Sequence, residues 1–199
     1  MRTPDIENEQ QMRAAIMAAA RKMFRKLGFE KTSMEDIARE IGRGKGTVYY
    51  YYKSKEEIFR LVAGAEFSEL INTINEAMNG VDTVSEKVAV FFITMSKVLR
   101  EKVVLYSVML KEHKAYMDPF SAFWKETYAA EIKMIKDLLA EGVKNGEFKS
   151  VSEKDCSALA EGLNMLWGGM EAEVIMFGMQ PLEESKIEKI IGAFIRGLR

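Results

Sequence analysis

The fold is decided by residues 32–59, TSMEDIAREIGRGKGTVYYYYKSKEEIF, in which two short helical segments flank a glycine turn. Apolar residues at helical spacing predict a helix over residues 33–41. Residues 42–44, Gly-Arg-Gly, predict a turn, because the first glycine can adopt the positive φ angle that a tight turn needs. A second short helix is expected over residues 45–51. Two helices joined this tightly in a basic segment predict a helix-turn-helix, whose second helix enters the major groove of DNA.

Four tyrosines follow one another on the second of these helices, and they cannot all face a core. Successive helical residues point about 100° apart, so Val48 and Tyr52 share a face. Because Val48 is apolar, we expect this face to pack on the preceding helices, with Tyr52 mostly buried. Tyr49 and Tyr50 then point outward, and Tyr51 lies at the margin.

The same segment resembles the signature of the TetR (tetracycline-repressor-like) family of transcriptional regulators. The matching positions are Ile37-Ala38, Gly42, Lys45-Gly46-Thr47, Tyr49, Tyr51 and Lys53-Ser54-Lys55-Glu56. Arg43 and Gly44 depart from the family pattern, which usually has a small apolar residue followed by Ser or Thr. The close match ends at residue 59, and the rest of the chain carries no family signature.

The resemblance implies contact with double-stranded DNA at a palindromic operator. The residues expected to touch DNA are Thr32, Ser33, Arg43, Gly44, Lys45, Gly46, Thr47, Tyr49, Tyr50, Tyr51 and Lys55. Their chemistry suits the role, because hydroxyl groups and ammonium groups can donate hydrogen bonds to phosphate oxygens and base edges. Charge points the same way. Residues 1–60 hold 13 Lys or Arg and 9 Asp or Glu, a net charge of +4, whereas residues 61–199 hold 16 and 21, a net charge of −5.

The composition favours an all-α protein. Of 199 residues, 48% are apolar and 30% charged, only three are proline, and helix-forming residues dominate. Further helices are expected at 8–27, 54–79, 83–101, 103–114, 120–145, 152–177 and 183–197, with Gly28 as the stop of the first. We divide the chain into a helix-turn-helix DNA-binding domain over residues 1–53 and a helical ligand-binding and dimerisation domain over residues 54–199.

Several functional classes are disfavoured. A single cysteine, Cys156, excludes a disulfide framework. The polar, acidic N-terminus is not a signal peptide, and no apolar run is long enough to span a membrane, so we expect a cytoplasmic protein without membrane partners. No nucleotide-binding loop, catalytic triad or metal-ligand cluster is evident. We therefore expect no enzyme activity, no metal and no cofactor.

The C-terminal part predicts a homodimer and a small-molecule effector. One set of residues is expected to form the dimer interface, and another is expected to line the effector pocket. The expected dimer interface is Leu163, Leu166, Met170, Ile187, Ile191, Phe194, Ile195 and Leu198, and the alternative is that these residues only form the chain's own core. An apolar effector pocket is expected at Phe91, Met95, Tyr106, Met109, His113, Phe123, Trp124, Trp167 and Met170.

These features favour a ligand-responsive, dimeric DNA-binding repressor, which a small, largely apolar effector releases from its operator. Two other classes are kept as alternatives. One is an enzyme, for which no motif was found. The other is a helical ligand-binding or scaffold protein that does not bind DNA.

Overall fold

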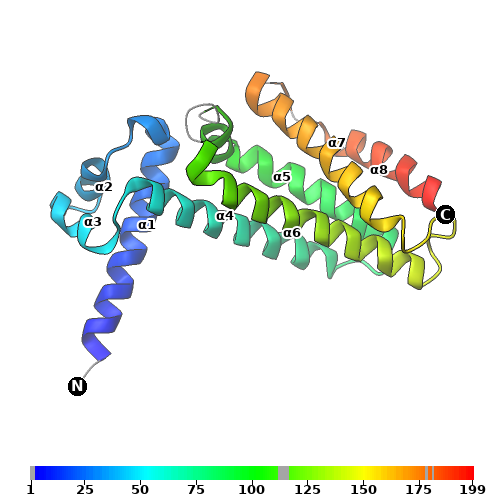
Figure 1. Ribbon diagram of the computed structural model, residues 1–199, viewed down its shortest axis with the longest axis horizontal. Coiled ribbons are helices and arrows are strands. Elements are labelled where there is room, and N and C mark those ends of the chain that lie inside the picture. Colours follow the sequence, from blue (N-terminus) through cyan, green and yellow to red (C-terminus); the bar gives the residue numbers. More distant parts are fainter. Residues whose placement is uncertain (1–2, 112–116, 178, 181) are drawn as a thin grey trace. The chain divides into compact units, whose positions relative to one another are not determined.

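The computed structural model describes residues 3–111, 117–177, 179–180 and 182–199, with side chains for all of these except 3–6, 99–111, 117–124, 171, 175 and 176. Eight helices and no strand occur among these residues, which confirms the all-α prediction (Figure 1). The helices are α1 (Thr3–Lys31), α2 (Met34–Glu40), α3 (Lys45–Tyr51), α4 (Lys55–Met78), α5 (Val84–Lys111), α6 (Met117–Lys144), α7 (Cys156–Phe177) and α8 (Glu184–Leu198).

One expected helix boundary is wrong. The two helices predicted at 83–101 and 103–114 form the single helix α5, which continues without a break to Lys111. Nothing in residues 98–107 is glycine or proline, and adding a residue to an existing helix is much easier than starting a new one. The last predicted residues, 112–114, lie outside the described part of the chain.

The chain forms two compact units. The first unit consists of residues 1–66 with 104–120, and the second consists of residues 67–103 with 121–199. The predicted helix-turn-helix domain lies within the first unit, which also takes in the first turns of α4. Helices α4 and α5 each supply residues to both units.

Three phenylalanines form the centre of the first unit. The ring of Phe59 in α4 lies 5.2 Å from that of Phe24 and 4.9 Å from that of Phe29, centroid to centroid, and all three are buried. Gly28 adopts a φ angle of 82°, which ends the regular part of α1 at the predicted stop and lets the next residue turn back into this core.

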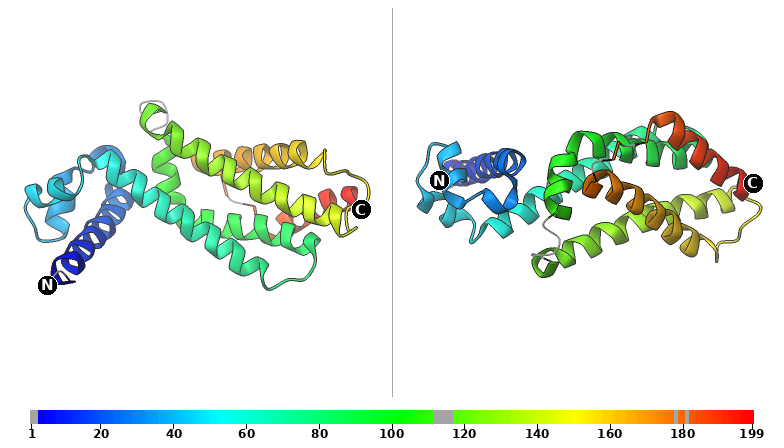
Figure 2. Two further views of the ribbon diagram at one scale, coloured as in Figure 1. Left: turned by 60° about the horizontal axis from the view of Figure 1, so that its bottom comes forward. Right: turned by 90° about the horizontal axis from the view of Figure 1, so that it is seen from above.

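The second unit is a bundle of the second half of α4 with α5, α6, α7 and α8 (Figure 2). The rings of Phe92 in α5 and Trp167 in α7 lie 5.1 Å apart, and every helix of the bundle contributes buried apolar residues to one core. Phe148 closes one end of α6, where its ring lies against Gly142 so closely that a β-carbon there would come within 2.2 Å of it. Glycine is therefore required at residue 142.

The carboxyl group of Glu131 is partly buried in this bundle. Glu131 in α6 is half-buried, and burial raises the pKa of its carboxyl to about 7, although a hydrogen bond with Asn164 of α7 acts in the opposite direction. Because the ordinary value is 4.5, the unfolded chain releases this proton at lower pH than the folded chain does. The folded state should therefore lose stability as the pH rises from about 4.5 to about 7.

Glu131→Gln is expected to remove this loss. At about pH 8 the variant should be more stable than the original protein, by up to roughly 3 kcal/mol, whereas near pH 4 the two should be similar. Urea denaturation at both pH values measures the difference. Glu126→Gln, at an exposed position of the same helix, is the matched control and should change little at either pH. An equal effect of Glu131→Gln at both pH values would contradict the assignment.

Candidate nucleic-acid interface

Helix α2 begins in a capping box. Ser33 is its N-cap, where the Oγ atom accepts a hydrogen bond from the Asp36 amide at 3.1 Å and the Ser33 amide donates to the Asp36 carboxylate at 3.0 Å. The hydrogen bond from the Ser33 hydroxyl lowers the pKa of Asp36, so the box is complete at neutral pH. The predicted start of this helix is confirmed.

The turn between α2 and α3 follows from Gly42. Its φ angle is 65°, in the left-handed region that favours glycine, and the amide of Arg43 donates to the Ala38 carbonyl at 2.9 Å. Ala38 and Ile37 are buried at the crossing with α3. Gly44 caps α3 from an extended conformation but contributes no side-chain hydrogen bond. A tightly joined helix pair results, as predicted.

Helix α3 presents most of its surface outward. Of its seven residues, all within the described part of the chain, only Val48 is buried. Tyr52, at the C-cap, is 4% exposed, whereas Tyr49 is 47% and Tyr50 is 80% exposed. Tyr51 is half-buried. The predicted division of the four tyrosines is therefore confirmed.

An arginine of α1 fixes the end of α3. The Arg13 guanidinium donates to the Tyr51 carbonyl at 3.2 Å and lies over the rings of Tyr51 and Tyr52, 5.4 and 5.5 Å from their centroids. Glu9 pairs with the same guanidinium at 3.1 Å. Sequence reasoning missed this contact, because it joins residues 38 positions apart and has no local signal.

The turn and the exposed side of α3 bring most of the predicted DNA-contacting residues together. Arg43, Gly44, Lys45, Gly46, Tyr49 and Tyr50 are exposed there, and Thr47 is half-buried. The ammonium of Lys45 lies 5.5 Å from the centroid of the Tyr49 ring. Nothing lies within 4 Å of the place that a β-carbon on Gly46 would occupy, so another molecule can approach the backbone closely. Ser33 is also exposed, at the start of α2.

Two residues of the predicted set have internal partners instead. Thr32 is 1% exposed, and its hydroxyl donates to the Gly28 carbonyl at 2.6 Å. The ammonium of Lys55 donates to the carbonyls of Phe29, Glu30 and Thr32 at 2.8, 3.1 and 3.1 Å. These contacts satisfy the carbonyl groups at the end of α1 and hold the start of α4 beside them.

A sequence profile described as "Bacterial regulatory proteins, tetR family" matches residues 16–62, the stretch that contains this helix pair. The chain belongs to the TetR family of transcriptional regulators. It is therefore grouped with DNA-binding proteins and not with enzymes.

The chain is also similar to individual transcriptional regulators. The uncharacterized HTH-type transcriptional regulator YfiR of Bacillus subtilis is 26% identical over 148 residues, which are 73% of this chain and 72% of that protein. The HTH-type transcriptional repressor KstR2 of Mycolicibacterium smegmatis is 25% identical over 69% of this chain and 67% of that protein. The fatty acid degradation regulator FadR from Bacillus halodurans has the same fold, with a TM-score of 0.74 at 18% identity over 94% of this chain and 96% of that one.

The expected effector pocket of this TetR-family chain is only partly described. Phe91, Met95 and Trp167 are buried in one core cluster of the second unit, and Met170 packs against it. The side chains of Tyr106, Met109, Phe123 and Trp124, and all of His113, lie outside the described residues. No group of three or more histidine, cysteine or acidic residues that could hold a metal ion occurs where side chains are described.

The expected dimer residues divide into two groups. Leu163, Ile187, Ile191, Ile195 and Leu198 belong to the chain's own core, so they cannot offer exposed area to a second subunit. Met170 and Phe194 are half-buried, and Leu166 is 71% exposed. Further exposed apolar residues on these two helices include Met165 and Ile190, which are 68% and 48% exposed. Within the described residues, no helix is long and apolar enough to cross a membrane.

The two sides of α3 predict different effects of removing a tyrosine ring. Tyr52→Ala should lower the melting temperature, because truncating a buried aromatic side chain costs roughly 3 kcal/mol or more. Tyr50→Ala, two positions earlier at an exposed site, should leave the melting temperature nearly unchanged. Thermal unfolding followed by circular dichroism measures both, and a larger effect for Tyr50→Ala would contradict the orientation of α3.

Proposed function

We propose that this TetR-family protein is a cytoplasmic, ligand-responsive dimeric repressor, which a small, largely apolar effector releases from a palindromic operator. The observation that carries the proposal is the exposed face of α3, which carries Lys45, Tyr49 and Tyr50 on a helix-turn-helix of a known regulator family. A face of this composition can donate hydrogen bonds to phosphate and contact base edges in a major groove.

Within this proposal, α3 is the recognition helix. Lys45 and Thr47 reach bases or phosphates near its N-terminus, while the open space above Gly46 allows the helix to approach the groove. Tyr49 and Tyr50 donate their hydroxyl groups to phosphate oxygens. Thr32 and Lys55 instead stabilise the helices that carry this surface, because their polar atoms donate hydrogen bonds to carbonyl groups at the end of α1.

A second copy of the chain is the proposed partner of the exposed side of α7. Met165 and Leu166 project there, and at Gly162 and Gly169 nothing lies within 4 Å of where a β-carbon would be, which allows another helix to approach closely. Ile190 of α8 adds exposed apolar area. A dimer would present two recognition helices to the two halves of a palindrome.

The proposed effector binds among the helices of the second unit. Their interior is rich in aromatic and methionine side chains, such as Phe91, Met95 and Trp167, which suit an apolar ligand. Binding would shift the dimer between conformations with different spacing of the recognition helices.

Lys45→Gln is expected to weaken DNA binding across many sequences. The magnitude of the slope of log affinity against log salt concentration should decrease by about 1 for each recognition helix bound. The reason is that a helix without this lysine neutralises one phosphate fewer and so releases fewer counterions from the DNA. The measurement uses a duplex selected from a random pool, titrated at several salt concentrations with and without candidate effectors. Lys149→Gln removes the same charge from an exposed site of the second unit and should leave the slope unchanged. Equal slopes for all three proteins would count against contact by Lys45.

Leu166→Glu is expected to convert the dimer into a monomer, because it would bury a charge without a partner in the interface. Sedimentation velocity at micromolar concentration measures the change. Leu61→Glu, at a site on α4 that is 47% exposed, is the control and should remain dimeric. A monomeric original protein at that concentration would overturn the proposed interface.

A further inference from the structure

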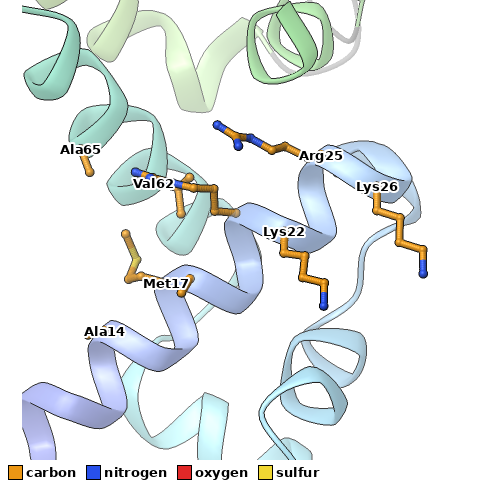
Figure 3. A pocket seen from close by; sticks show the side chains of 9 residues that line it. Ala14, Met17, Lys22, Arg25, Lys26, Val62 and Ala65 are labelled. Carbon is orange, nitrogen blue, oxygen red and sulfur yellow. The ribbon is translucent and has the colours of Figure 1, made fainter. Parts of the chain in front are cut away.

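A groove of about 710 Å³ lies between α1 and α4 in the first unit (Figure 3). One part of its lining is apolar and consists of Ala14, Met17, Ala18, Val62 and Ala65. The other part is basic and consists of Arg21, Lys22, Arg25 and Lys26. None of the described residues that line it is acidic. A groove of this size falls in the range that small-molecule ligands occupy.

The two arginines of the groove are held in place by one carboxylate. Glu66 in α4, which is only 3% exposed, pairs with Arg21 at 3.3 Å and with Arg25 at 2.9 Å. In these contacts one carboxylate faces two guanidinium groups, each of which carries five N–H donors. The shared carboxylate orders the two arginine side chains that line the groove.

The basic residues do not all face the same way. In Figure 3 the side chains of Lys22 and Lys26 extend away from Met17 and Val62, whereas that of Arg25 extends on the side of Val62. Lys22 also forms an ion pair with Glu40 of α2. Arg25 is therefore placed to meet a charge above the apolar floor, and Arg21 pairs with the same carboxylate.

We propose that this groove binds a single-chain amphiphile with an anionic head, either a carboxylate or a phosphate. The head would lie at Arg21 and Arg25, whose forked N–H donors match both groups, and the chain would cover Met17, Ala18 and Ala65. A duplex phosphate fits less well, because it brings no apolar part to cover this floor. The site lies within the first unit and is separate from the effector site proposed among the helices of the second.

Photo-crosslinking of the full-length protein tests the proposal. The probe is a dodecanoate with a photoreactive group on its chain, used below its micelle concentration, and mass spectrometry locates the labelled peptides. Label is expected on residues 14–18 and 62–65. Unlabelled dodecanoate or dodecyl phosphate should compete, the stronger competitor identifying the preferred head group, and dodecanol should compete at least roughly tenfold more weakly because it lacks the charge.

Three variants separate binding from folding. Arg25→Gln should reduce labelling of these segments roughly tenfold, since it removes a charge-assisted hydrogen-bond donor. Lys31→Gln removes a charge at an exposed position of α1 that does not line the groove, and it should not reduce labelling. Arg25→Gln also removes a partner of buried Glu66 and could weaken the fold, so Ala18→Leu provides a second variant that fills the exposed floor and keeps every charge. It should block labelling with an unchanged melting temperature.

Three results would overturn the proposal. They are equal labelling in Arg25→Gln and Lys31→Gln, full labelling in Ala18→Leu, and competition by dodecanol as strong as by dodecanoate. Label found only on residues of the second unit would also reject this groove, while leaving the effector proposed for that unit in place.

Discussion

The packing of Val48 and Tyr52 against the first unit is the contact on which the proposed DNA-binding surface depends. Helix α3 has seven residues, and a helix of that length does not persist alone in water. Its orientation is set by these two buried side chains, four positions apart, and by the Arg13 guanidinium that binds its last turn. Because few side chains are needed to hold the helix in place, its other side chains remain available to contact another molecule.

A second constraint lies behind α3, where three helices meet at the end of α1. Gly28 turns the chain, and the carbonyls that this turn exposes are collected by the Lys55 ammonium. The Phe29 ring contributes as well, because the same ammonium lies 4.4 Å from its centroid in a cation–π contact. Lys55 thus ties the start of α4 to the link between α1 and α2. Lys55, which the sequence suggested as a phosphate contact, thus has a structural role in the folded chain. It stabilises the helices that carry the proposed DNA-binding surface.

The parts of this structure that could be predicted from the sequence are those with local causes. The start of α2 beside Ser33, the stop at Gly28 and the turn at Gly42 each depend on residues within one helical turn, and each is found where it was expected. The roles of Thr32, Lys55 and Arg13 could not be foreseen in this way. Their partners are distant in sequence, up to 38 residues away for Arg13, and become neighbours only when the chain folds.

The apolar stripe of α8 illustrates a different limit. Periodicity shows that Ile187, Ile191 and Ile195 share a face, but it does not show whether the chain itself or a second copy covers that face. In the structure the chain covers it, and the apolar surface left over lies at Met165 and Leu166 of α7 and at Ile190 on another side of α8. A dimer built on this surface would consequently leave the core of each subunit intact. Association could then be weakened at Leu166 without unfolding the subunit, which a dimer built on the α8 core residues would not allow.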